Sequence, residues 1–595
     1  MQIPRHALAR GGAQASQVNS KTCVNETALL LAGPLENSTA GRLEKILAVL
    51  GVASVRKTVA EFLAARDGSP AHVLCSSGAF SELAAVLEQN PGVAKRIRSA
   101  FVFAAEDPAL FSTLARKITG DPAAGLSPVS PGAEWSVTAE WPEFCQSMSG
   151  VRSPVSRNSG DTALVFNGTH ARATRIISSG NAVGLARFEF HSVPVFLSTA
   201  GVMDVAAPLR TREFDLRGHF LAAVPVVLYA RWAFAATCWQ PPEVCACLVI
   251  DDPLLRPRYG FLDYQHLLGL MERVGFSTSI AFIPWNWKRS AQKTVRLFRE
   301  NPGRLSLSIH GCDHADREYA SRNRDRLAWK SRLALQRMAR HESRTGLRHD
   351  PVMVFPQGVF SEAAMAALKH GGFTAVVNND VLSADPPPRP ITIADYWNVA
   401  VMNYSDFPIF TRRYPWAGVD NFAFDILLGK PCLVSVHHND CHDEGRHVVK
   451  ILEQLNRLNV RLRWTNLAEV VRRSFRQREV SPDAVEVEIF GGETRIENAS
   501  GRKRLFHLRK RESAPETIAE IRAGAQPVRW TAAESQIAFA IELNPGEHQT
   551  VTLQFREMGG NGFKGETLLY RAKTMARRYL CEMRDNYLMR KSFSE

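Results

Sequence analysis

The chain has 595 residues and a mass of 66.0 kDa, too much for one hydrophobic core, so we expect about three or four folded units. Hydrophobic residues make up 45% of the chain and charged residues 22%, a balance that excludes a mainly disordered protein. The formal net charge of +14 favours anionic partners, and nucleic acid, a phospholipid surface and an acidic glycan all fit this charge.

The first residues, 1–25, are polar and rich in small side chains, so we predict a flexible N-terminus. They contain no apolar segment of the secretory type, and we therefore predict a cytoplasmic protein. The ten cysteines are scattered thinly, and several stand inside apolar runs, as in Cys245-Ala-Cys247. That usage is typical of buried free thiols rather than of a disulfide framework.

The next two segments alternate apolar runs with polar ones. Residues 26–155 predict an α/β domain with parallel strands, and they contain no glycine-rich nucleotide motif. Residues 156–242 predict a strand-rich segment packed on the domain that follows. The apolar run 220–239 is long enough for a membrane span, but Pro225 and Arg231 interrupt it. We therefore predict a buried element, with peripheral membrane contact as the alternative.

Residues 243–475 form the longest regular pattern. Apolar strands are predicted at 247–251, 278–282, 304–310, 352–356, 374–378, 398–402 and 432–437, with helices between them. Buried strands alternating with helices indicate a (β/α) barrel or a doubly wound sheet. The polar residues cluster where strands end, which is where barrel enzymes hold their catalytic groups: Asp251, Asp252, His310, Gln357, His437 and His438.

The C-terminal part has two textures. Residues 476–557 are short alternating strands broken by Gly, Pro and Asn, and predict a small β-sandwich. Residues 558–595 predict one basic amphipathic helix. Its apolar positions share a face: Leu568, Ala572, Met575, Tyr579, Met583 and Tyr587. Intramolecular packing, a membrane surface and a protein partner are all possible for that face, and we favour a protein partner.

Three short motifs in residues 243–475 carry the chemistry. Asp251-Asp252 closes one apolar strand, and adjacent carboxylates there point in different directions, so one can bind a cation while the other stays free as a base. His310 and His314 are four residues apart, which suits chelation of one ion. His437-His438 closes a later strand. Each motif alone is more typical of a loop, a cap or a helix surface, but their common position after strands of one domain predicts convergence.

These motifs resemble those of the polysaccharide deacetylases with the NodB-homology domain, a carbohydrate esterase type. That family has an Asp-Asp pair after the first strand, an H-x-x-x-H motif after a later one, and an L-x-H motif near the end, matched here by Val436-His437. The resemblance covers roughly 243–475. It implies a distorted (β/α) barrel, a carbohydrate substrate bearing an N- or O-acetyl group, and one divalent metal ion such as zinc.

The resemblance also implies residue roles. It assigns three residues to the metal: Asp252, His310 and His314. Such a set leaves coordination positions open for water and for a substrate carbonyl. Asp251 becomes the general base, and His437 becomes the general acid, with His438 as the alternative.

One expected residue is missing. The family has an arginine that steadies the catalytic aspartate, followed by an aromatic-Pro turn, but the matching segment here is Val354-Phe355-Pro356-Gln357-Gly358. Arg256 and Arg258 are the candidates to replace it. Because of this gap, two alternatives to a sugar deacetylase stay open: a catalytically inactive glycan-binding or scaffolding protein, and a metal hydrolase of a non-sugar amide.

Two further segments bear on the substrate. Residues 317–348 carry nine arginines and one lysine, which favours a solvated helix face over a rim that gathers an anionic substrate. No nucleic-acid module accompanies them, so we predict no nucleic-acid partner. The aromatic residues in 395–416 fit a sugar-stacking wall and a buried core equally well. On the first interpretation, Trp397 and Tyr404 contact the sugar. Together with Arg256 and Gln357 they are the predicted substrate-binding residues.

Overall fold

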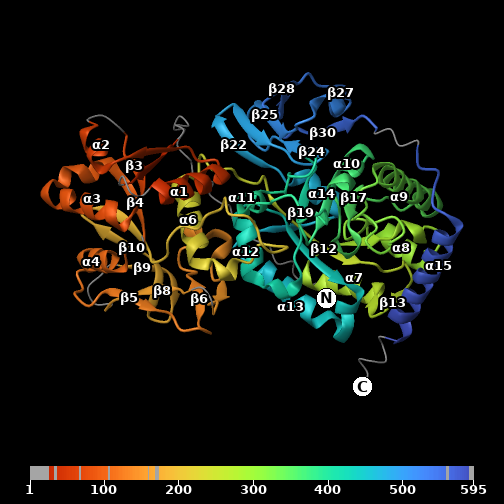
Figure 1. The fold of residues 1–595 in the computed structure, drawn as a ribbon, viewed down its shortest axis with the longest axis horizontal. Coiled ribbons are helices and arrows are strands. Elements are labelled where there is room, and N and C mark those ends of the chain that lie inside the picture. Colours follow the sequence, from red (N-terminus) through yellow and green to blue (C-terminus); the bar gives the residue numbers. More distant parts are fainter. Residues whose placement is uncertain are drawn as a thin grey trace, which may run out of the picture.

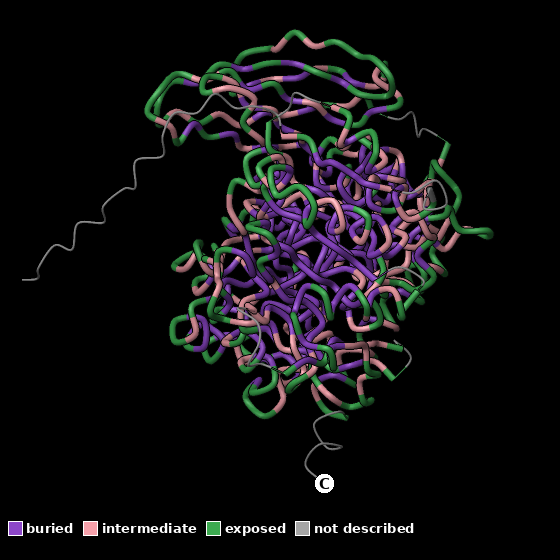
Figure 2. The backbone as a smooth tube through the Cα atoms, turned by 90° about the vertical axis from the view of Figure 1, so that its left-hand side faces the viewer, coloured by how far each residue is buried: buried purple, intermediate pink, exposed green. Residues whose placement is uncertain are grey.

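The computed structural model describes residues 26–32, 37–65, 69–104, 107–157, 160–167, 173–557 and 562–588. The predicted flexible segment 1–25 lies outside these residues. Figure 1 shows an N-terminal α/β region on one side, a barrel on the other, and a β-rich region above the barrel. Buried residues dominate the main body of the molecule, whereas in the β-rich region at the top buried and exposed stretches alternate (Figure 2).

The N-terminal region is built on one 11-stranded sheet. Its parallel part is β2 (Ser54–Lys57), β1 (Ala28–Leu31), β3 (Ala71–Ser76), β4 (Ile97–Phe103) and β11 (Val193–Ser198). Its antiparallel part contains β10 (Ala182–Phe190), β9 (Thr174–Ser179), β6 (Glu134–Val137) and β7 (Arg152–Pro154), with β5 (Gly125–Pro128) and β8 (Thr162–Val165) beside them. The sheet crosses the predicted division at residue 155, because β4 before it pairs with β11 after it.

Helices cover both faces of this sheet, which explains why its strands are apolar on both sides. Side chains of α1 (Asn37–Leu50) and α6 (Phe220–Ala233) belong to one core, and those of α3 (Ser77–Gln89) and α4 (Pro108–Thr119) belong to the other. Most of the apolar run at 220–239 is thus a buried helix, α6, followed by a turn. Within it the Arg231 guanidinium donates to Gln240 Oε1 at 2.9 Å. Among the described residues, no helix is both long and apolar enough to cross a membrane.

The central region is a curled parallel sheet. Its strands run in the order β19 (Ile409–Thr411), β18 (Ala375–Asn378), β17 (Val352–Val354), β16 (Leu305–His310), β15 (Thr278–Phe282), β12 (Val244–Asp251) and β20 (Cys432–His437), with β21 (Leu462–Trp464) beside β12. The connecting helices include α7 (Tyr264–Val274), α8 (Gln292–Glu300), α9 (Arg324–Thr345), α10 (Glu362–His370), α12 (Val419–Leu427) and α13 (Arg446–Asn456). The sheet closes where Arg413, just after β19, bridges Val434 of β20. The prediction of a distorted (β/α) barrel is confirmed.

One predicted strand is wrong. Residues 398–402 follow directly on the short helix α11 (Ile393–Trp397), and Val401 makes only an isolated bridge with Ile409. The sixth strand around the barrel is instead β19. Residues 398–402 still have the apolar content of a strand, because Val399, Ala400 and Met402 fill the barrel interior from a non-regular segment.

The C-terminal β-rich region has two sheets around one core, as expected for a β-sandwich. One sheet contains β22 (Arg476–Ser481), β23 (Ala484–Glu488), β25 (Arg504–Arg511), β29 (Gln536–Leu543) and β28 (Thr531–Ala533); the other contains β24 (Glu493–Glu497), β30 (His548–Phe555), β26 (Ile518–Ala523) and β27 (Gln526–Pro527). A buried ion pair joins the sandwich to the barrel, because Lys369 Nζ lies 2.7 Å from both Glu512 carboxylate oxygens. Beyond the sandwich, α15 (Leu568–Met583) and the π-helical turn Arg584–Leu588 return along the outside of the barrel (Figure 1).

Candidate metal centre and active site

The ends of neighbouring parallel strands bring the first two motifs together. Asp252 follows β12, His310 ends β16, and His314 lies in the loop after β16. Asp252 and His314 have φ values of 82° and 55°, in the left-handed region that side chains rarely adopt. Such backbone conformations persist only where surrounding contacts hold them, and they concentrate at functional sites.

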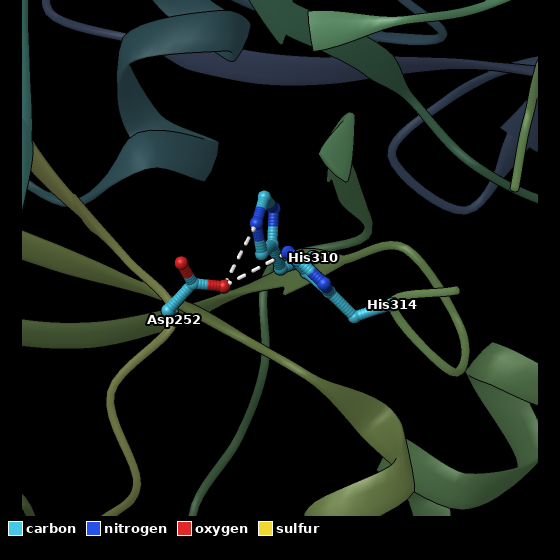
Figure 3. A group of neighbouring side chains, drawn as sticks. All are labelled: Asp252, His310 and His314. Atoms are coloured by element: carbon cyan, nitrogen blue, oxygen red, sulfur yellow. Dashed lines mark ion pairs between the residues drawn. The ribbon is translucent and has the colours of Figure 1, made fainter. Parts of the chain in front are cut away.

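The three side chains point toward one another (Figure 3). Asp252 Oδ1 lies 3.4 Å from His310 Nε2 and 3.0 Å from His314 Nε2. One ligand atom from each residue lies within 4.8 Å of the others, a spacing that fits one metal ion between them.

The hydrogen bonds around the group leave its ligand atoms available. His310 Nδ1 lies 2.9 Å from the Val354 carbonyl oxygen, which can only accept, so Nδ1 carries the proton and Nε2 keeps its lone pair for a metal. Asp252 Oδ1 is buried and receives no hydrogen bond of ordinary geometry. A carboxylate and two imidazoles fit a zinc-type ion.

Glu318 fixes the loop that presents His314. Its carboxylate accepts hydrogen bonds from the backbone N–H groups of Cys312 at 3.1 Å, Asp313 at 3.0 Å and His314 at 3.1 Å. Gly311 begins this loop with φ 65°, and a Cβ there would lie 2.5 Å from Pro356 Cγ, so only glycine fits. The position of the third ligand therefore depends on a carboxylate outside the ligand set.

A second group of ligand-type side chains lies directly behind the first, formed by Cys312, Asp313 and Glu318. Protein cations already occupy it. Lys330 Nζ lies 2.8 Å from Asp313 Oδ2 and 2.8 Å from Glu318 Oε1, and Arg337 lies 2.6 Å from Asp313 Oδ1. Burial and the neighbouring carboxylates raise the pKa of the Cys312 thiol well above its usual value. This group is a buried salt-bridge cluster rather than a metal site.

Asp251, the neighbour of Asp252 and the predicted general base, is paired with Arg412. Both side chains are buried, and the guanidinium donates to the two carboxylate oxygens at 2.7 and 2.6 Å. Burial alone would raise the Asp251 pKa, but the charge of Arg412 outweighs it and the pKa lies below the usual value. This arginine comes from residues 395–416, the segment whose aromatic residues predicted a sugar-stacking wall or a buried core. The overlooked signal is Arg412-Arg413-Tyr414-Pro415, an arginine before an aromatic-Pro pair directly after an apolar strand.

The expected replacements for this arginine are wrong. Arg256 Nη1 lies 2.6 Å from Glu582 of the C-terminal segment, and Arg258 Nε lies 2.7 Å from Asp263. Asp251 is paired with Arg412 instead.

The two histidines at the end of β20 have different surroundings. His437 stands opposite Asp251 in the β12–β20 register, is half-buried, and lowers the Asp251 pKa. His438 is buried, packs edge-on against Tyr259 at 5.0 Å, and lies 3.4 Å from Asp585. A Cβ on Gly260 would lie 2.4 Å from His438 Nδ1, so His438 is closely packed. Of the two, His437 is the one that stands beside Asp251.

The predicted substrate-binding residues have different surroundings, and Arg256 is paired with Glu582. Trp397 and Tyr404 have exposed fractions of 1% and 0%, and the Tyr404 hydroxyl donates to the Val381 carbonyl, so both belong to the core. Gln357 is exposed but is bonded to the loop after His314, accepting from the Arg317 N–H at 3.0 Å. The basic stretch is not simply a solvated face either, since Lys330 and Arg337 point inward.

An aromatic pair that was not singled out lies beside His437. The rings of Tyr414 and Trp416 stack with centroids 4.3 Å apart, and Tyr414 also stacks against His437 at 6.2 Å. Trp416 is 59% exposed, which is unusual for so large an apolar side chain. Exposed rings next to a polar site are suited to contact with a sugar face.

Comparisons with known proteins concern this region's fold. No protein-family model matches the chain, and a search of curated proteins found no match. Among solved structures, a mutant of a CE4 family pseudoenzyme with restored enzymatic activity is 12% identical; the match covers 39% of this chain and 68% of that one, with a TM-score of 0.24. A putative polysaccharide deacetylase from Mycobacterium smegmatis is 11% identical, with 39% and 92% covered and a TM-score of 0.28. An allantoinase is 12% identical, with 39% and 89% covered and a TM-score of 0.26.

Proposed function

We propose that the barrel is a metal-dependent hydrolase that removes an acetyl group from a carbohydrate. The observation that carries this proposal is the juxtaposition of two differently equipped carboxylates at one strand end. Asp252 faces two histidines with its ligand oxygen available, whereas Asp251 is held ionised by the buried Arg412. One carboxylate is thereby suited to hold a cation and the other to accept a proton.

The residues of the site divide the reaction between them. Asp252, His310 and His314 would hold one divalent ion, of which zinc suits the ligand set best. When bound, such an ion acts as a Lewis acid toward water and toward a carbonyl oxygen. Asp251 accepts the proton of the attacking water, because Arg412 keeps it charged and oriented. His437, across the site on β20, gives a proton to the leaving nitrogen or oxygen. The ring pair of Tyr414 and Trp416 binds the sugar.

The inactive alternative was motivated by the missing arginine. Arg412 removes that motivation, because it makes a two-point contact with Asp251 from another segment. A non-sugar amide substrate stays an outcome of the experiment below.

The test is acetate release from N-acetylated and O-acetylated oligosaccharides by zinc-loaded protein, next to a panel of non-sugar amides. We expect wild-type activity on an acetylated sugar and a loss of about 100-fold or more in Asp251→Asn. Asp443→Asn, which changes an exposed carboxylate in the loop after β20, is the matched control and should keep full activity. Activity on non-sugar amides alone would reject the carbohydrate assignment, and no hydrolysis anywhere in the panel would reject the enzyme.

A further inference from the structure

The C-terminal helix α15 lies on the barrel in an unusual orientation, because its polar side faces inward. Tyr570 Oη lies 2.7 Å from Lys330 Nζ and 3.1 Å from Asp313 Oδ2. Further along the same face, Glu582 pairs with Arg256 at 2.6 Å, and Asp585 accepts a hydrogen bond from the Tyr259 hydroxyl at 2.9 Å. Thr574 and Arg578 on this face are buried. These contacts are distributed along the helix and fix which of its faces lies against the barrel.

The opposite face is apolar and, within the described part of the chain, largely exposed; at its edge the Tyr579 ring still packs against Trp285, with centroids 6.1 Å apart. Of the large hydrophobic side chains that are exposed within the described part of the chain, eight of twelve belong to this segment. They are Leu568 (82%), Leu569 (65%), Met575 (51%), Tyr579 (49%), Leu580 (64%) and Met583 (57%), followed by Tyr587 (70%) and Leu588 (64%) in the π-helical turn. An amphipathic helix normally buries its apolar stripe on its own domain, so a stripe turned outward indicates an external partner.

Cations line both margins of this stripe. At about 100° per residue, Lys573 and Arg577 fall on one margin of the apolar face and Arg571 falls on the other. In the part of the chain that the structure describes, none of the three makes an ion pair with a carboxylate. The acidic residues of the segment, Glu582 and Asp585, point inward and are already paired.

We propose that the outward face of α15 binds an anionic membrane surface. The apolar stripe would lie among the acyl chains and the marginal cations among lipid phosphates, which is the arrangement of helices that lie in the membrane plane. A second copy of the chain fits less well. An isologous contact through this face would bring the same basic margins together, in a chain whose net charge is +14. This inference does not depend on the proposed hydrolase activity.

The experiment is flotation of the full chain with vesicles at about 0.1 M salt. The wild type should float with vesicles of phosphatidylcholine and phosphatidylglycerol, and a far smaller fraction of it should float with vesicles of phosphatidylcholine alone. The double variant Leu580→Glu, Met583→Glu should bind about 10-fold more weakly or worse. The double variant Lys573→Glu, Arg577→Glu should also lose binding, and the difference from the wild type should grow with the fraction of anionic lipid in the vesicles.

Leu505→Glu is the matched control, because Leu505 is another exposed leucine, on β25 of the sandwich, with 38% exposure. It should bind vesicles as the wild type does. An unchanged unfolding midpoint in every variant shows that the fold is intact. Absence of wild-type binding to the anionic vesicles, or equal binding by both double variants, overturns the proposal. A dimer in sedimentation velocity that Leu580→Glu, Met583→Glu dissociates overturns it in favour of a second copy.

Discussion

Two groups of ligand-type side chains share the loop after β16, and only one of them is equipped to bind a metal. Asp252, His310 and His314 face one another, and among the described residues no lysine or arginine makes an ion pair with Asp252. Cys312, Asp313 and Glu318 are equally close together, but Lys330 lies within 2.8 Å of both carboxylates. Proximity of ligand atoms is therefore a weak criterion for a metal site. What separates the two groups is whether the protein has already neutralised the carboxylates.

The strongest test of this comparison is removal of one residue from each group. Asp252→Ala takes away the only carboxylate ligand of the first group, so we expect zinc affinity to fall by more than about 100-fold. Cys312→Ala removes a thiol that Lys330 and Arg337 already surround, so zinc content should stay unchanged. Metal content after dialysis and a competition titration measure both. Equal losses of zinc in the two variants would contradict the distinction.

The next test concerns stability. Lys330→Met leaves the buried carboxylates of Asp313 and Glu318 without their shared cation, so we expect the free energy of unfolding to fall by about 3–5 kcal/mol. Arg326→Met is the control, because Arg326 is a partly exposed partner of Glu566 on the same helix and should cost about 1 kcal/mol or less. Urea unfolding of metal-free protein measures both. A small effect of Lys330→Met would show that the second group is not held by charge.

Asp251 combines features of the two groups. It is adjacent to the metal ligand Asp252, but an arginine, Arg412, neutralises its charge as Lys330 does in the second group. Arg412→Lys keeps the charge but loses the two-point contact with the carboxylate, and we expect kcat to fall by about 10–100-fold with zinc content unchanged. Arg258→Lys, which changes an exposed arginine paired with Asp263, should leave kcat as it is. Steady-state kinetics on the acetylated sugar that is hydrolysed fastest measures both variants. A loss of zinc in Arg412→Lys would contradict this prediction, because it would show that Arg412 supports the metal site rather than Asp251.

The smallest expected effect is on pH dependence. Burial opposes ionisation of Asp313, but Lys330 and Arg337 outweigh it, so its pKa in the folded state lies below the unfolded value of about 3.8. A carboxyl group with a lowered folded pKa contributes stability above about pH 4 that is lost as the pH falls through the folded pKa. Unfolding of the wild type should therefore become easier as the pH falls below about 4, and Lys330→Met should show a shallower slope. An identical slope in the two proteins would contradict this assignment.

Much of the fold could be predicted from local pattern. The strands predicted at 278–282 and 432–437 agree in full with β15 and β20, and the one at 304–310 agrees with β16 except for its first residue. Their apolar runs end at polar residues, so the sequence shows both the element and its boundary. The strand predicted at 398–402 was wrong, because apolar residues also fill the barrel interior from irregular backbone.

The sequence by itself determined which residues could act as ligands and that they follow strand ends: Asp252, His310 and His314 are identifiable from their types and spacing alone. Only the tertiary structure decided the rest of the site. Arg412 reaches Asp251 across 161 residues of sequence, because the barrel closes at the segment after β19. The choice of His437 over His438 depends on Tyr259 and Asp585. The outward apolar face of α15 depends on the same kind of distant contact, since the polar groups of the barrel surface select the polar face of the helix. Local patterns follow backbone geometry, whereas pairing of distant charges is decided only when the chain is folded.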